Sequence, residues 1–337
     1  MTFAPCLANK VAIALPFPQP SASDPHPVTT AVFPSKFNII FFFLNLYFNS
    51  NIIIIKSLIF MIDIKDLIKS RYAQDSDLKK SFDIPDSISK RILRKSCRKF
   101  KKSKISKEIL ISLIASAQAA PSKSNLQQYS VLSIKNKEMK NRLSKLLGKT
   151  AWALEAPLFF LFLADIRRNK IITEHKGYEY KNNSIDYFMN AVIDASLAMQ
   201  NLINSAEEYG LGICPISMVR NHLEEVKKMC YLPEGVFPIA GLSVGWPDEN
   251  NEVSIRLPMK VVFHEDFYND KDIINQIDDY DKTIQSFQPI PKSKQRHVNV
   301  YGFNEKNTWS ENISRQMSLP ERKEFKKWLK SHGFNLD

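Results

Sequence analysis

Apolar residues recur at helical spacing in several segments downstream of residue 61. In 106–120, positions 109, 110, 113, 114 and 117 are apolar, which is the period of an amphipathic helix. The same pattern predicts helices over 61–95 with a break near 83–89, over 137–148, over 221–233 and over 319–334. The longest predicted helix covers 184–212.

Strand patterns alternate with these helices. Residues 129–135 alternate apolar and polar, and 156–165 form a continuous apolar run of strand length, which favours a strand buried on both faces. The runs 237–247 and 259–264 are also predicted as strands, whereas 210–220 is interpreted as a connection. Helices interleaved with strands predict an α+β or α/β protein with a mixed sheet.

The 184–212 segment is unusual because large apolar residues run along it in one stripe. One stripe at helical spacing contains Ile185, Phe188, Met189, Val192, Ile193, Leu197, Ile203 and Ala206. Ser196 and Gln200 fall on the same stripe, and small residues such as Ala191 and Ala195 permit close helix packing. The pattern predicts a central helix that also carries a subunit contact.

The first sixty residues differ from the rest. Residues 37–60 are long enough to span a bilayer, but four asparagines and Lys56 interrupt them. Three interpretations remain: a membrane anchor, an extension, or translated upstream sequence with Met61 as the true start. None of them places chemistry in this segment.

Composition excludes several kinds of site. The nine glycines form neither G-x-G-x-x-G nor a P-loop, so a nucleotide-like phosphate would be held by side chains. Four cysteines and six histidines show no metal-ligand spacing, so no metal site is expected. The sparse thiols favour a reducing, cytoplasmic location. A net charge of +12 favours anionic partners.

The positive charge is densest in "RILRKSCRKFKKSK", residues 91–104. In extended backbone, Arg94, Ser96 and Arg98 share one face, and two guanidiniums with a hydroxyl suit a phosphate dianion. Lys95, Lys99 and Lys101 then point the other way, into solvent, and a wholly solvated charge run is the alternative interpretation. Nucleic-acid binding is not expected, because Phe100 is the only aromatic residue available for stacking.

Two further stretches carry polar groups. In "AAPSKSNLQQY" (119–129), hydroxyl and amide side chains follow a helix end, and either turn chemistry or contact with the edge of a heteroaromatic ring explains them. In "SIRLP", Arg256 stands between apolar neighbours and needs an anion or a carboxylate. Each stretch alone is compatible with a structural role.

Taken in order, these stretches resemble the nitroreductase family. The motifs are "RKSCRKF", "AAPSKSNLQ", "AMQNLINSAEEYGLG", "GLSVGWP" and "IRLPMKVVFHEDFY", followed by a tail that includes "NTWSENISRQM". That tail is typical of the branch of NADPH-dependent nitroreductases and NADPH–flavin oxidoreductases. The resemblance implies a three-layer α+β sandwich with a mixed sheet, an obligate homodimer, and FMN bound at the subunit interface.

The resemblance also implies which residues bind the cofactor. Arg94, Lys95, Ser96, Arg98 and Arg256 match the family's phosphate and ribityl site. The loop along the flavin ring is matched by Ser122, Lys123, Ser124, Asn125 and Gln127, and a second loop near the ring by Pro215, Ile216, Ser217 and Met218. Ser124, Arg296 and Arg322 match positions near NADPH or the substrate, and Lys294 lies beside Arg296. No catalytic nucleophile or acid–base pair is implied, because the chemistry takes place at the flavin.

Two departures from the branch pattern stand out. Ser254 occupies the place of a lysine in K-P-R-L-P, and Ser217–Met218 replaces a Gly-Gly pair. The predicted domains are an atypical extension (1–60), an FMN-binding domain (61–270) and a branch-specific tail (271–337).

The predicted function is electron transfer from NADPH to nitroaromatics, quinones or flavins by a ping-pong mechanism. The alternatives are a relative with another flavin role, such as a dehydrogenase of peptide azolines, or a membrane-tethered binding protein with a degraded flavin site. The expected partners are small-molecule electron acceptors, and association with a membrane is not expected.

Overall fold

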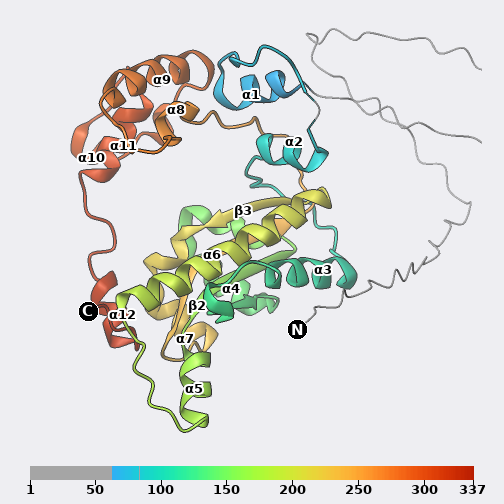
Figure 1. Ribbon diagram of the computed structural model, residues 1–337, viewed down its shortest axis with the longest axis vertical. Coiled ribbons are helices and arrows are strands. Elements are labelled where there is room, and N and C mark those ends of the chain that lie inside the picture. Colours follow the sequence, from blue (N-terminus) through green and yellow to red (C-terminus); the bar gives the residue numbers. More distant parts are fainter. Residues whose placement is uncertain (1–62, 83) are drawn as a thin grey trace, which may run out of the picture. The chain divides into compact units, whose positions relative to one another are not determined.

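The computed structural model describes residues 63–82 and 84–337. The expectations for residues 1–60, including the membrane anchor and the upstream start, lie outside the described residues. Within the described part, the strands form one sheet in the order β1-β2-β4-β3 (Figure 1). The strands are β1 (Tyr129–Ser133), β2 (Leu158–Asp165), β3 (Gly212–Ile216) and β4 (Val236–Gly245).

The two central strands, β2 and β4, are buried along their whole length. Side chains of β2 alternate between two apolar clusters. Phe160 and Phe162 pack with α3 (Lys107–Gln118) and α6 (Ile185–Glu208), whereas Phe159 and Leu161 pack with α4 (Lys137–Leu147) and α7 (Leu223–Cys230). Helices therefore cover both faces of the sheet, and the predicted three-layer α+β sandwich is confirmed.

The remaining elements surround this sandwich or follow it along the chain. Helix α12 packs its Leu329 into the same cluster as Phe160. A smaller cluster forms around Ile255, Tyr280 and Ile284. The other helices are α1 (Ile64–Tyr72), α2 (Asp86–Ile92), α5 (Arg167–His175), α8 (Met259–Val262), α9 (Ile273–Phe287), α10 (Val298–Tyr301), α11 (Trp309–Met317) and α12 (Phe325–Ser331); the 3-10 turns are η1 (Lys123–Asn125), η2 (Gly148–Glu155), η3 (Ser217–Asn221) and η4 (Lys292–Lys294).

Three strand predictions were wrong. Residues 259–262 form the short helix α8, because a brief apolar run has no period that separates helix from strand. Residues 212–216, expected to be a connection, form the strand β3. The sheet is not mixed, since all its named strands pair antiparallel. Apolar runs predict burial but do not encode strand direction.

Helix α6 has two different faces. Its side toward the sheet is made of small residues such as Ala191, Ala195 and Ala198, which are fully buried. The large apolar residues Ile185, Met189, Ile193 and Leu197 are instead 38–53% exposed. The predicted stripe is therefore divided. Phe188, Val192, Ile203 and Ala206 belong to or pack against the core, whereas the four exposed residues form an apolar stripe on the surface of their own chain.

No helix within residues 63–82 and 84–337 is both long and apolar enough to cross a membrane.

Candidate functional site

The basic segment lies along the outer edge of β3. Ser96 forms a parallel bridge with Ile213, and the Cys97 N–H donates to the Ile213 carbonyl over 2.9 Å. Phe100 forms an antiparallel bridge with Pro247. The segment therefore extends the sheet beyond β3, although it is too irregular to count as a full strand.

Two glycines allow this close approach. Gly212 and Gly245 pair directly opposite each other in β3 and β4. A Cβ atom on Gly212 would lie 2.6 Å from Cβ of Cys97, and one on Gly245 would lie 2.8 Å from Cδ1 of Phe100. Real Cβ atoms do not approach so closely, so any larger residue at either position displaces the basic segment.

The segment lies close to the buried thiol of Cys214 in β3. Burial raises the pKa of this thiol, while the charges of Arg98 and Arg94 and the Ser96 side chain oppose the rise. That Arg94, Ser96 and Arg98 share one face stays a prediction, since residues 94–97 all line one cavity.

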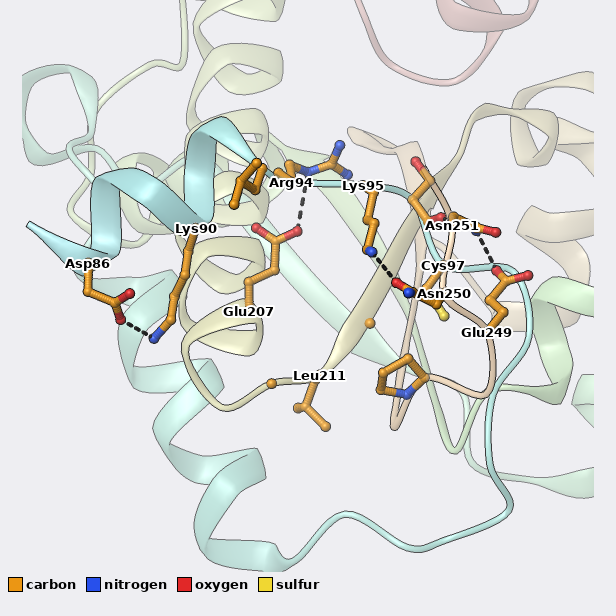
Figure 2. A pocket seen from close by; sticks show the side chains of 15 residues that line it. Asp86, Lys90, Arg94, Lys95, Cys97, Glu207, Leu211, Glu249, Asn250 and Asn251 are labelled. Atoms are coloured by element: carbon orange, nitrogen blue, oxygen red, sulfur yellow. Dashed lines mark hydrogen bonds and ion pairs between the residues drawn. The ribbon is translucent and has the colours of Figure 1, made fainter. Parts of the chain in front are cut away.

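The lysines of the segment differ from these residues. Lys95 Nζ donates to the Asn250 side-chain oxygen over 2.5 Å, as Figure 2 shows. Lys99 and Lys101 are exposed. They lie in solvent as expected. The same expectation for Lys95 was wrong, because Asn250 holds its ammonium group and the residue lines a cavity.

A cavity of about 410 Å³ opens beside Arg94 and Lys95, and Glu207 at the end of α6 lines it as well (Figure 2). Arg94 Nε lies 3.5 Å from the Glu207 carboxylate, whose side chain is only 14% exposed. Burial raises the pKa of Glu207 to about 7, although Arg94, Arg91 and Arg71 lower it. The carboxylate is therefore only partly ionised near neutral pH.

Arg71, in the last turn of α1, is a buried arginine behind this cavity. Its guanidinium donates to the Ser254 carbonyl over 2.7 Å, to the Arg94 carbonyl over 2.6 Å and to the Ile92 carbonyl over 2.7 Å. The Arg71 carbonyl in turn accepts the N–H of Arg256 over 2.9 Å. Two chain segments that are far apart in sequence, 92–94 and 254–256, therefore meet at one residue.

The same region concentrates positive charge. Burial lowers the pKa of Arg71, and the charges of Arg256 and Arg94 lower it further. A second cavity of about 420 Å³ is lined by Arg71, Arg91, Arg94 and Arg256. With Glu207 only partly ionised, such a cluster favours an anion that carries more than one charge.

Strand β3 leads from the basic segment to the second predicted loop. From Ile213, opposite Ser96, to Ile216 the strand rises by about 10 Å. Met218 follows in η3 and packs against the cluster on the α4–α7 face. Arg322 lies beside this turn, since its Nε donates to Asn221 Oδ1 over 2.7 Å. The tail arginine is thus placed near one end of β3.

The loop 122–127 is held by α6. Ser122 Oγ donates to the carboxylate of Asp194 over 2.6 Å and accepts the Gln127 N–H over 2.7 Å. The side-chain amide of Gln127 donates to Asn125 Oδ1 over 3.2 Å. Ser124, Asn125 and Gln127 adopt φ near +50°, which is uncommon outside glycine. The Ser122 hydroxyl is therefore committed to the loop, while Lys123, Ser124 and Asn125 are exposed.

Within one chain, this loop lies far from the basic segment. The loop is hydrogen-bonded to Asp194, whereas Arg94 faces Glu207. Asp194 and Glu207 are thirteen positions apart in α6, which is about 20 Å along the helix axis. The loop also leads into β1, while the basic segment borders β3, the opposite edge of the sheet. The predicted flavin residues therefore form two separate groups on each chain.

Arg296 belongs to neither group. Its side chain is exposed, and its N–H donates to Asn312 Oδ1 in α11 over 2.8 Å. Lys294 nearby is exposed as well. Their predicted contact with NADPH stays a prediction.

Three residues of these groups were missed from the sequence, namely Arg71, Asp194 and Glu207. Arg71 and Asp194 each carried a signal. Arg71 continues the apolar stripe of Ile64, Leu67 and Ile68, and Asp194 stands among the small apolar residues of α6. A charged residue on the buried face of a helix needs a partner, so each pointed to one.

Comparison with known proteins agrees with this picture. Residues 93–246 match the nitroreductase family, and residues 255–337 match the nitroreductase family C-terminal domain. The FMN reductase (NADPH) of Bacillus subtilis (strain 168) is 34% identical over 245 residues, which cover 72% of this chain and 95% of that protein.

Solved structures show the same fold. NfrA2 of B. megaterium matches with a TM-score of 0.68 and 31% identity, covering 75% of this chain and all of that one. The NADPH:FMN oxidoreductase of Vibrio harveyi, complexed with NAD+, matches with a TM-score of 0.65 and 27% identity, covering 74% of this chain and 99% of that one. The resemblance drawn from the motifs is thus confirmed, and the chain belongs to the nitroreductase family.

Proposed function

We propose that the protein is an FMN-dependent oxidoreductase that takes electrons from NADPH and passes them to nitroaromatics, quinones or flavins. The observation that carries this proposal is the gathering of Arg94, Arg256 and Arg71 around one cavity, where segments 92–94 and 254–256 meet. Two of the relatives are described as an FMN reductase (NADPH) and an NADPH:FMN oxidoreductase.

The residues present fit FMN. The phosphate dianion would be held by Arg94, Ser96, Arg98 and Arg256, and Glu207 accommodates its charge by remaining partly protonated. The ring would lie toward Pro215, Ile216, Ser217 and Met218 at the far end of β3. The span of about 10 Å along β3 is comparable to an extended ribityl chain. Ser254 contributes a carbonyl to Arg71, so the cationic character there comes from α1.

A homodimer would complete the site. The loop with Ser122, Lys123, Ser124, Asn125 and Gln127 cannot reach the basic segment of its own chain, but it could reach that of a second copy. The apolar stripe from Ile185 to Leu197 offers a surface for that contact, because four large side chains there are exposed in line. The flavin would then lie between subunits and contact both.

When bound, FMN supplies the two-electron chemistry that links NADPH to the acceptor. The chain's own residues bind the phosphate, orient the ring and shape the pocket for donor and acceptor. One pocket serving both partners in turn predicts a ping-pong mechanism. Arg322 beside η3 would face the substrate end, and Arg296 would contribute to the preference for NADPH.

Two kinetic measurements test the proposal. The apoprotein, reconstituted with FMN, should oxidise about one NADPH per bound flavin on its own and should continue to turn over only when a nitrofuran, a quinone or free flavin is supplied. Plots of reciprocal rate against reciprocal NADPH concentration, made at several fixed acceptor concentrations, should give parallel lines. A protein that stays colourless after addition of FMN would contradict the proposal and support a degraded site.

The alternative role in peptide azoline oxidation has less support. Residues 255–337 match the nitroreductase family C-terminal domain. That match belongs to the branch on which the main interpretation depends. A substrate screen that gave azoline oxidation without NADPH consumption would favour the alternative.

A further inference from the structure

Helix α1 stands outside the part of the chain that matches the family. The match begins at residue 93, whereas α1 covers Ile64–Tyr72. Its apolar residues Ile64 and Leu67 are buried. Its last turn nevertheless reaches the cationic cluster through Arg71, which is only 7% exposed.

Arg71 donates to three carbonyls rather than to any carboxylate. Nε and one terminal nitrogen donate to Ile92, the same terminal nitrogen donates to Arg94, and the other donates to Ser254. Four hydrogen bonds therefore use four of the five N–H groups of the guanidinium. Such a residue is committed to shaping backbone and has little capacity left to grip a ligand.

The backbone that it shapes is that of the proposed phosphate site. Arg94 is bonded through its own carbonyl, and Arg256 donates its N–H to the Arg71 carbonyl. The next two residues reach the start of the C-terminal segment. Tyr72 lines a cavity together with Ile255, and Ala73 packs against the apolar cluster that contains Ile255. The guanidinium and the main chain of Arg71 together thus set the distance between Arg94 and Arg256.

We infer that α1 is a positioning element, in which Arg71 holds Arg94 and Arg256 at the spacing that binds the FMN phosphate. This inference rests on the proposed function, because it takes the ligand of the cluster to be FMN. Arg71 does not touch the phosphate; it acts through the backbone of residues 92–94 and 254–256. It also gives this chain a cation beside Ser254, where the related branch has a lysine.

The test compares FMN with riboflavin, which lacks the phosphate. Dissociation constants of the apoprotein for both flavins are measured by quenching of flavin fluorescence. In Arg71→Gln, the constant for FMN should rise by about tenfold or more, while that for riboflavin changes less than about twofold. A general loss of structure would weaken both flavins alike, and that result would overturn the inference.

Arg71→Lys separates position from charge. Lysine keeps the positive charge but cannot donate to three carbonyls in a planar fork. It should therefore lose FMN selectively, as Arg71→Gln does. An FMN affinity equal to that of the unaltered protein would show that charge alone suffices, and it would overturn the positioning role. Should Arg71→Gln fail to fold, Arg71→Lys decides the question.

Arg315→Gln is the matched control. Arg315 is also 7% exposed, and it too donates to a backbone carbonyl, that of Gly302, over 2.7 Å. Its loss should lower the melting temperature without changing the ratio of the two flavin constants. An equal change in that ratio would mean that any lost buried arginine has this effect. If the unaltered protein binds riboflavin as tightly as FMN, the proposed phosphate site itself fails, independently of Arg71.

Discussion

Arg98 and Lys101 lie three residues apart in one basic stretch but have different surroundings. Both are exposed, but Arg98 lies close enough to the Cys214 thiol, in the middle of β3, to oppose the rise of its pKa, whereas Lys101 donates its N–H to the Trp246 carbonyl. Arg98→Ala should therefore weaken FMN binding by about 1.5–3 kcal/mol, the range for a hydrogen bond to a charged group. Lys101→Ala should change it little. Titration of both apoproteins with FMN measures this, and equal losses would indicate a diffuse field rather than a site.

Glu207 should make stability depend on pH. Its pKa in the folded protein is about 7, mainly because of burial, against an ordinary value of 4.5. The folded state thus holds this proton more tightly than the unfolded state, so the free energy of unfolding should fall as pH rises through that window. Glu207→Gln should remove this part of the slope and stabilise the apoprotein most above about pH 7.

Urea unfolding of both proteins across that pH range provides the measurement for Glu207. The difference in unfolding free energy between variant and unaltered protein should grow with pH. A constant difference would mean that the carboxylate is ionised throughout.

At this scale the sequence showed which residues carry charge. Arg94 and Arg256, expected at one site, line the same cavity, whereas a common face for Arg94, Ser96 and Arg98 stays a prediction. Sequence reasoning did not find Arg71 or Glu207, because their partners lie far along the chain, at Ser254 for Arg71 and at Arg94 for Glu207. A single sequence contains the charged residues but not the distances between them.

At the scale of elements, α6 carries the clearest prediction. Ile193 lies in the exposed stripe and is 49% exposed. Ile193→Asp should separate the proposed dimer into monomers, since it places a charge within an apolar contact. FMN affinity should fall with it, because the site would lose the loop from the second copy. Light scattering after size exclusion gives the mass.

Ile171→Asp is the control for this change. Ile171 is 51% exposed on α5, away from the stripe. This variant should keep the mass of the unaltered protein. A dimer that survives Ile193→Asp would place the interface elsewhere.

The elements themselves were predictable to different degrees. The helices with long periods and the wholly apolar strand β2 were found, because burial leaves a strong pattern. Strand β3 was missed because it is short, contains Pro215, and begins at Gly212 just after Gly210, so that its start looks like a loop. The reason for Gly212 became visible only once Cys97 was seen to lie against it.

At the scale of the whole molecule, residues 1–60 should be dispensable for the site. Within residues 63–82 and 84–337, the contacts named for the site join residues downstream of Met61, and the family match begins at residue 93. A protein that starts at Met61 should therefore fold and bind FMN with unchanged affinity. Calorimetric titration of both forms tests this. Insolubility of the shortened protein, beside a soluble full chain, would contradict it.

The order of the patterns predicted an α+β or α/β protein, and the family resemblance supplied the three-layer sandwich, but neither gave the direction of the strands. Direction depends on how connections cross the sheet, and no local pattern encodes that. The separation of the loop at Asp194 from the charges near Glu207 became evident only in three dimensions.

The basic segment has a second effect on the molecule, because it covers the outer edge of β3. A bare edge strand exposes unpaired N–H and C=O groups and invites edge-to-edge pairing with other molecules. Pro215 removes one donor, and the Cys97–Ile213 hydrogen bond occupies an acceptor. Since the proposed phosphate site lies in that same segment, losing the cofactor and loosening the cover would be coupled. A shortage of flavin would then promote aggregation of the chain as well as lower its activity.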